Sequence, residues 1–122
     1  MRTIKFRIFN KKIKSYIDIH SSAIMIDELN NLNDNLIVEQ FTGLHDKNGK
    51  EIYEGDIVSY KRNVGNWTGK SLTTIHEIIF TEEINAFVMK DNSGYIKLRK
   101  HWGYEYEVIG NIYETFSQVI IF

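Results

Sequence analysis

Alternating hydrophobic and polar residues at the start of the chain predict a β-hairpin. In residues 2–9 the apolar side chains of Ile4, Phe6 and Ile8 fall on one face, and polar or cationic side chains fall on the other. A polar stretch then turns the chain, and residues 13–19 return with isoleucines on a shared side. Together the two segments predict an N-terminal β-hairpin.

The rest of the chain predicts further short strands separated by turn residues. One segment, residues 22–31, instead predicts a short helix, with Ser22 as a candidate N-cap. The strand-like segments are residues 36–41, 57–60, 75–80, 86–90, 104–108 and 109–113. Short strands at this spacing are typical of a small barrel or sandwich. We therefore expect a single, mainly β domain over residues 1–122, with an N-terminal β-hairpin and one or two short helices.

Composition and charge narrow the class of protein. At 122 residues, with 43 % hydrophobic and 25 % charged residues, the chain is typical of one soluble globular domain. No apolar run approaches the roughly 20 residues that span a membrane, and the charged first segment is unlike a signal peptide. The absence of cysteine excludes disulfides and thiolate sites. A cytoplasmic protein is expected, and the heavy use of isoleucine, asparagine and lysine, which have AT-rich codons, indicates a low-GC bacterium or its phage.

The longest patterned segment is "FTGLHDKNGKEIYEGDIV". Its "DKNG" is a turn sequence in which Asp46 can accept hydrogen bonds from its own backbone and Gly49 tolerates a positive φ. A calcium loop is excluded, because Gly49 stands fourth rather than sixth from Asp46 and Ile57 occupies the twelfth position. Glu54 and Asp56 offer two metal oxygens beside a bend, but Asp56 is equally suited to bind backbone amides. The segment favours a structural role over a metal site.

Residues capable of catalysis are present, but not in a catalytic pattern. The four histidines are too far apart for a local metal motif; they are His20, His45, His76 and His101. Gly65 and Gly69 lack the surrounding residues of a phosphate-binding loop. Glu105 and Glu107 on one face of a strand are typical of solvated charge rather than of an acid–base pair. We expect no catalytic residue, no cofactor and no metal, and hence no enzyme.

Two basic groups are candidate contacts for a partner or for nucleic acid, although the net charge is only −1. The first belongs to the N-terminal hairpin and consists of Lys5, Arg7, Lys11 and Lys12. The second belongs to a glycine-containing stretch and consists of Lys61, Arg62, Trp67 and Lys70. A basic face can be merely solvated or can bind phosphate. Trp67 can fold back onto the barrel, anchor an interface or stack on a base, and the sequence leaves these alternatives open.

Three motifs carry a resemblance to a known family. They are "MRTIKFRIFNKK" at the start, "FTGLHDKNGKEIYEGDIV" in the middle and "YEVIGNIYE" near the end. With them the chain resembles the YopX family of phage and prophage proteins over nearly its full length. The resemblance implies a mainly β fold with a small SH3-like barrel element, an N-terminal addition and a tendency to self-associate. It implies no established activity, and the C-terminal "TFSQVIIF" departs from the usual tail of the family.

The resemblance also implies structural roles for residues in the central and late motifs. Many SH3-like barrels begin a strand with a sequence such as "YEGDIV", in which Tyr53 would pack, Gly55 would permit the bend and Asp56 would bind amides. Gly110 would permit the kink that barrel closure needs. The full set expected to be structural is Gly43, Asp46, Gly49, Tyr53, Gly55, Asp56 and Gly110.

Two functions are consistent with these features. The first is a non-enzymatic phage or prophage accessory protein that binds a host or phage protein, acts as a homo-oligomer and does not involve a membrane. Self-association is expected through the apolar end of the chain, because four apolar residues at a terminus must be covered; these are Val119, Ile120, Ile121 and Phe122. The alternative is a nucleic-acid-binding β-barrel module that uses the two basic groups on phosphate, with Trp67 or Trp102 stacking on bases. The net charge of −1 favours the protein-binding hypothesis.

Overall fold

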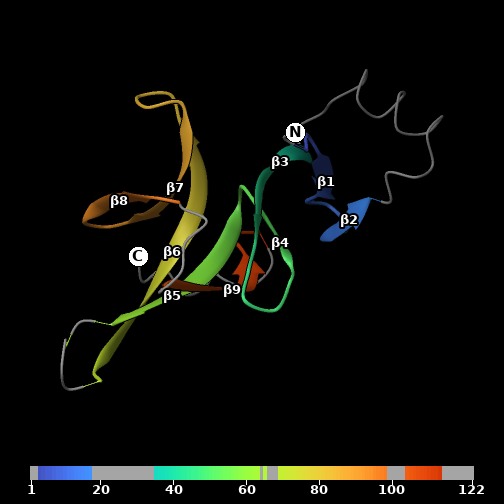
Figure 1. Cartoon of the computed structure of the whole chain (residues 1–122). Helices are drawn as coiled ribbons and strands as arrows, with labels where there is room; N and C mark the ends of the chain where they lie inside the picture. Colours follow the sequence, from blue (N-terminus) through green and yellow to red (C-terminus); the bar gives the residue numbers. More distant parts are fainter. Residues whose placement is uncertain (1–2, 18–34, 64, 66–68, 99–103, 114–122) are drawn as a thin grey trace.

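Two antiparallel sheets make up the part of the chain that the computed structural model describes, residues 3–17, 35–63, 65, 69–98 and 104–113. One sheet has four strands in the order β2-β1-β3-β4, and the other has five in the order β8-β7-β6-β5-β9 (Figure 1). The strands are β1 (Phe6–Asn10), β2 (Ser15–Ile17), β3 (Leu36–His45), β4 (Glu51–Tyr53), β5 (Asp56–Asn63), β6 (Ser71–Thr81), β7 (Ala86–Asp91), β8 (Gly94–Lys97) and β9 (Tyr104–Asn111). The mainly β fold expected from the sequence is confirmed.

No helix occurs in the described ranges. The short helix predicted over residues 22–31 lies outside them. Within the same ranges, no helix is long and apolar enough to cross a membrane.

The N-terminal hairpin forms as predicted, but its buried residues differ from the predicted set. Strands β1 and β2 pair antiparallel, with Ile8 opposite Ile17. Ile8 and its neighbour Phe9 are both buried, whereas Phe6 is exposed. Phe9 is covered because its ring contacts those of Tyr16 and Tyr113, at centroid distances of 5.0 Å and 5.4 Å. Both faces of β1 are therefore covered, and simple alternation along it does not separate a buried face from a solvated one.

Strand β3 changes partner along its length. Residues 36–40 pair with β1, and from Phe41 onward β3 pairs with β4. The register shifts between Phe41 and His45, and Gly43 within that stretch has a φ of +89°. A left-handed glycine at an irregular point in a strand lets the backbone bend without steric cost. The bend lies where β3 leaves β1 to meet β4.

The five-stranded sheet curls into a half-barrel, with β5 between β6 and β9 (Figure 1). Ile57 pairs with Gly110 and Val58 pairs with Val108, so Ile109 is an extra residue in β9. Such a β-bulge increases the local twist and bends the strand. It lies beside Gly110, where the resemblance implies a kink. The half-barrel is a coarser description than the SH3-like barrel element, which stays a prediction.

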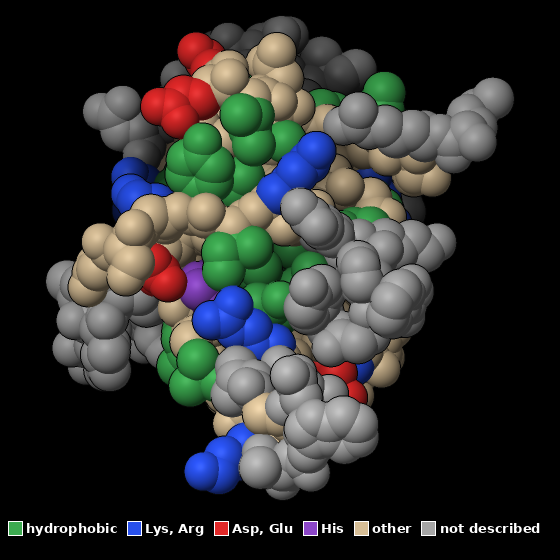
Figure 2. All heavy atoms as spheres, turned by 60° about the vertical axis from the view of Figure 1, so that its left-hand side comes forward, with side chains coloured by type: hydrophobic (Ala, Val, Ile, Leu, Met, Phe, Trp, Pro, Cys, Tyr) green, Lys and Arg blue, Asp and Glu red, His purple; other side chains and the backbone are tan. Residues whose placement is uncertain are grey.

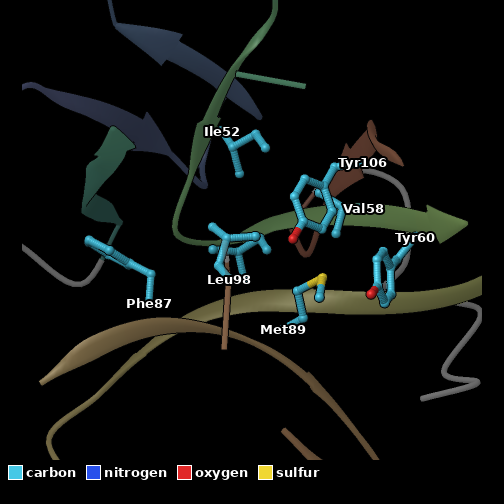
Figure 3. Close-up of a cluster of buried hydrophobic side chains, with 8 residues drawn as sticks. Ile52, Val58, Tyr60, Phe87, Met89, Leu98 and Tyr106 are labelled. Carbon is cyan, nitrogen blue, oxygen red and sulfur yellow. The ribbon is translucent and has the colours of Figure 1, made fainter. Parts of the chain in front are cut away.

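The main hydrophobic core lies inside this curl. Figure 3 shows its side chains pointing toward one another from β4, β5, β7 and β9. The buried cluster consists of Ile52, Val58, Tyr60, Ile78, Phe87, Met89, Leu98 and Tyr106. The rings of Tyr60 and Tyr106 stack at a centroid distance of 5.4 Å. Ile52 is the member contributed by β4, so the four-stranded sheet is packed onto the half-barrel through its last strand.

Candidate functional site

A buried ion-pair network ties the N-terminal hairpin to the central motif. Arg7 on β1 donates from Nε to Oε1 of Glu39 on β3 at 2.8 Å, and from Nη2 to Oδ1 of Asp56 on β5. The two carboxylate side chains are 3 % and 2 % exposed, and that of Arg7 is 16 % exposed. The guanidinium lies between two aromatic rings, with Cζ 4.4 Å from the ring centroids of both Tyr16 and Tyr53. The network therefore joins strands of both sheets.

Burial and charge act in opposite directions on the titration of this network. Burial would lower the pKa of Arg7, but the carboxylates of Asp56 and Glu39 outweigh it and raise that pKa above its ordinary value. Burial raises the pKa of both carboxyls, and the attraction of Arg7 offsets only part of the increase. Burial also raises the pKa of Tyr53 to about 12, helped by the hydrogen bond to Glu51. One guanidinium facing two carboxylates leaves the ionised network with excess negative charge.

The "YEGD" turn places its backbone directly against this network. Gly55 has a φ of +87°, and a Cβ built there would lie 1.8 Å from Oε2 of Glu39. Only glycine fits both the conformation and the space. Oδ2 of Asp56 accepts the backbone N–H of Tyr53 at 2.8 Å, which is the amide-binding role that the resemblance implies. Tyr53, Gly55 and Asp56 thus hold the bend between β4 and β5.

Asp46 fastens the preceding turn to β9. Its Oδ1 accepts the backbone N–H groups of Asn48 and Lys50, both at 2.9 Å, and its Oδ2 accepts that of Val108 at 3.0 Å. Burial alone would raise the pKa of Asp46, but these three hydrogen bonds outweigh it and lower the pKa below its ordinary value. Gly49 follows with a φ of +82°. No group of three or more metal-ligating side chains occurs among the described residues, and Asp46 has the turn-forming role that its sequence predicts.

A groove of about 220 Å³ lies between β3 and β6, next to this network. Val38 lines it on one side and Phe80 on the other, and these two residues are 37 % and 43 % exposed. Ile79 of β6 and Tyr113, which follows β9, add further apolar surface. The exposed lining of the groove is nevertheless more polar than apolar, so these side chains are apolar contact points in a polar groove.

Backbone groups of two strand edges point into this groove. Strand β6 pairs with β5 only as far as Glu77, and its residues 78–81 pair with β7 alone. Residues 36–40 of β3 pair with β1 alone. The turn at residues 54–55 bridges both edges at one end, because Glu54 N–H donates to Gln40 O and Gly55 N–H donates to Ile78 O.

Successive residues of a strand direct their N–H and C=O groups to opposite edges, and this alternation shows which of these groups have no hydrogen-bond partner across the groove. Val38 stands two residues before Gln40, so its N–H and C=O groups point to the same side of β3 as those of Gln40. Phe80 stands two residues after Ile78, so its N–H and C=O groups point to the same side of β6 as those of Ile78. The peptide groups of Val38 and Phe80 therefore face the groove, and neither is bonded on that side within the described part of the chain.

Comparison with known proteins places the chain in a family. The family model described as YopX protein matches residues 7–117. The chain belongs to the YopX family. The crystal structure of protein EF1440 from Enterococcus faecalis is similar to this YopX protein with a TM-score of 0.62 and 22 % identity, over 99 % of this chain and 100 % of that one. At this identity the likeness shows a shared fold alone. The comparison with curated proteins gives no match.

The YopX resemblance that the three motifs carry is therefore confirmed. Of the residues expected to be structural, Gly55 lines the groove, but the residues that form its two open edges are not among them. Sequence reasoning missed Val38 and Phe80, because each is an unremarkable apolar residue of a strand. Phe80 ends a predicted strand and Val38 lies within one, and only the pairing pattern reveals that their edges are open. An unpaired strand edge has no local sequence signal.

The structure separates the two basic groups of this YopX protein instead of bringing them together. Lys61 and Lys70 are exposed near the ends of β5 and β6, far from β1 and β2 in Figure 1. Figure 2, which shows the molecule from the side of β8, has lysine and arginine side chains dispersed among exposed hydrophobic ones. Arg62 is partly buried, and its Nε has no hydrogen-bond partner among the described residues. Trp67 and Trp102 lie outside the described residues.

In the basic group of the N-terminal hairpin, two of the four residues pair with carboxylates of the same chain. The sequence predicts Arg7 on a polar face open to a partner, but Arg7 lies in the buried network because that face packs against Tyr16 and Tyr53. Lys5 pairs with Glu51 at 2.8 Å. Lys11 and Lys12 are exposed in the turn after β1. The residues Val119, Ile120, Ile121 and Phe122 lie outside the described residues.

A second polar cluster surrounds His76 on β6, which is buried. Its Nε2 lies 2.6 Å from Oγ1 of Thr74, and its Nδ1 lies 3.4 Å from Oδ2 of Asp91. Burial lowers the pKa of His76, Asp91 offsets part of that effect, and the positive charge of Arg62 lowers the pKa further. The spacing of two residues from buried Ile78 is the sequence signal that places this histidine on the inward face.

His76 is expected to make stability depend on pH below neutrality. Because its pKa is lower in the folded protein, the unfolded chain binds a proton first, so the free energy of unfolding falls as the pH drops below about 6.5. His76→Gln should remove this part of the pH dependence. Urea unfolding at pH 7.5, 6.5 and 5.5 measures it as the difference between the wild type and the variant.

The matched control is Asn92→Gln, since Asn92 is exposed and its side chain carries no titratable group. Its difference from the wild type should stay constant over the same pH range. A constant difference for His76→Gln as well would contradict the prediction.

Proposed function

We propose that this YopX-family protein is a non-enzymatic phage or prophage accessory protein that binds a protein partner in the bacterial cytoplasm. The observation that supports this most is the groove between β3 and β6, into which the peptide groups of Val38 and Phe80 are directed. Unpaired strand edges are a recurrent site of strand addition. No activity is needed to explain the arrangement of the described side chains.

Strand addition divides affinity and specificity between backbone and side chains. An extended segment that enters the groove can hydrogen-bond to the peptide groups of Val38 or Phe80, each bond contributing about 0.5–1.5 kcal/mol. Its side chains then contact the side chains of the walls, which include the apolar residues Ile79 and Tyr113. The backbone bonds are independent of sequence, so the walls select the partner.

Self-association remains part of the proposal. The family resemblance and the apolar end of the chain support it, and that end consists of Val119, Ile120, Ile121 and Phe122. The SH3-like barrel element belongs to the same proposal, supported by the curled five-stranded sheet and the bulge at Ile109. Nucleic-acid binding has less support, because Arg7 is buried in ion pairs and the basic residues of the two groups lie apart.

A pull-down with matched edge variants tests the proposal. Tagged protein is incubated with a lysate of the low-GC bacterium that carries it, with and without nuclease. We expect a partner protein that survives nuclease and is at least about fivefold depleted with Val38→Lys, because a cation at an open edge hinders strand addition. Ile96→Lys is the control, since Ile96 is 38 % exposed on β8, away from the groove.

The remaining outcomes contradict the proposal in different ways. Proteins that are lost after nuclease treatment would favour the nucleic-acid alternative. A partner that both variants retain equally would mean that the groove is not the binding site.

A further inference from the structure

The walls of the groove carry carboxylates, and none of the described residues that line it is a lysine or arginine. The three acidic residues are Glu39, Glu54 and Glu77. Glu39 shares the single guanidinium of Arg7 with Asp56, so this side of the groove is not neutralised. The groove is therefore mainly polar and negatively charged, with apolar side chains on both walls.

The three carboxylates differ in the hydrogen-bond donors and cations that they already contact. Glu39 accepts hydrogen bonds from Arg7 and from the hydroxyl of Tyr16, at 2.8 Å and 3.1 Å. Oε1 of Glu54 accepts the backbone N–H of Gln40 at 2.8 Å. Glu77 on β6 lies opposite Lys90 on β7. Burial raises the pKa of Glu77, and the charge of Lys90 offsets only part of that effect. Because Glu39 already pairs with Arg7, Glu54 and Glu77 are the wall carboxylates available to a new positive charge.

We propose that the groove binds an extended segment of a partner protein in which a lysine or arginine alternates with apolar residues. This inference rests on the proposed protein-binding function. The segment adds as a strand to the edge at Phe80 or at Val38, its cationic side chain pairs with Glu77 and Glu54, and its apolar side chains contact Phe80, Val38 and Tyr113. Successive side chains of a strand point to opposite sides, so an alternating segment can meet both kinds of surface.

Charge complementarity is the reason for a cationic partner rather than a neutral one. A neutral segment would exclude water from Glu77 and Glu54 without replacing the lost hydration, which is costly for a carboxylate. A lysine or arginine at that point compensates with a charge-assisted hydrogen bond. An acidic segment would add repulsion to the lost hydration and should be rejected.

Selection from a random heptapeptide library displayed on filamentous phage, with the full-length protein as bait, tests the inference. The wild type should enrich peptides with lysine or arginine next to apolar residues. Glu77→Lys should lose that preference and shift selection toward acidic peptides. A selected cationic peptide should bind Glu77→Gln roughly three- to tenfold more weakly than the wild type, as measured by fluorescence anisotropy.

Glu82→Lys is the matched control, because it makes the same change of charge at an exposed position in the β6–β7 turn. It should select the same peptides as the wild type. Val38→Lys should bind none of them, which assigns the selection to the groove. Equal shifts with Glu82→Lys and Glu77→Lys would mean that net charge alone selects, and would overturn the inference.

The failure of this inference and that of the proposed function are distinguishable. Enrichment of peptides without a charge preference, lost with Val38→Lys, would overturn the cationic partner and leave binding at the groove intact. The absence of any peptide sensitive to Val38→Lys would overturn both. Enrichment of a peptide that matches a segment of this chain would instead identify a second copy as the occupant, and would overturn the separate partner protein.

Discussion

Replacing Arg7 with methionine is expected to lower the free energy of unfolding by about 3–5 kcal/mol. Methionine keeps much of the length of the side chain but leaves Glu39 and Asp56, which are 3 % and 2 % exposed, without their cation. The rings of Tyr16 and Tyr53 also lose the guanidinium between them. Urea or guanidinium unfolding followed by intrinsic fluorescence measures the change.

A surface ion pair of the same strand region supplies the control. Lys5 and Glu51 are 2.8 Å apart, and their side chains are 43 % and 32 % exposed. Lys5→Met should therefore cost less than about 1 kcal/mol. Similar losses for Arg7→Met and Lys5→Met would contradict the view that burial gives the Arg7 network its effect.

Acidification should partly restore the Arg7→Met variant. Burial raises the pKa of Glu39 and Asp56 even with Arg7 present, and loss of the cation raises both further. A carboxyl with a raised folded-state pKa stabilises the fold below its unfolded pKa, and that contribution is lost as the pH rises through the folded pKa. The gap between variant and wild type should therefore narrow toward pH 4, and a gap that widens would show that the carboxyls are not the groups left uncompensated.

Short-range features of this protein are predictable from its sequence. The hairpin, most strands and the turn at Asp46 depend on contacts a few residues apart, such as the hydrogen bonds from Asn48 and Lys50 to Asp46. The identity of the family follows from three contiguous motifs. Alternation and turn chemistry suffice for these features because each is decided locally.

Long-range features are not predictable in the same way. Arg7 is 32 residues from Glu39 and 49 residues from Asp56, and alternation along β1 correctly gives its face but not what covers that face. The contact of Asp46 with Val108 spans 62 residues. Predicting the groove would require still more long-range information, because it lies where two strands of different sheets each lack a paired strand on one side. Sequence alternation reports on the faces of a strand and is silent about its edges.

Gly55→Ala is expected to lower the free energy of unfolding by about 2–4 kcal/mol, through two effects at one atom. An alanine at the φ of +87° is strained by about 1–3 kcal/mol. Its Cβ would also lie 1.8 Å from Oε2 of Glu39, so that carboxylate must move. Glu39 has little freedom to move, because Arg7 and Tyr16 both hold its other oxygen.

Gly49→Ala separates these two effects, because Gly49 has a similar φ of +82° and nothing within 4 Å of the added Cβ. It should show the backbone strain alone, and the difference between the two variants measures the displacement of Glu39. Equal losses in urea unfolding would mean that Glu39 moves aside at no cost, and that the network tolerates a change of its geometry.

Because Gly55 N–H also bonds to Ile78 O at the end of the groove, Gly55→Ala should in addition weaken partner binding, whereas Gly49→Ala should leave it unchanged. The single glycine thus couples the stability of the ion-pair network to the shape of the binding edge.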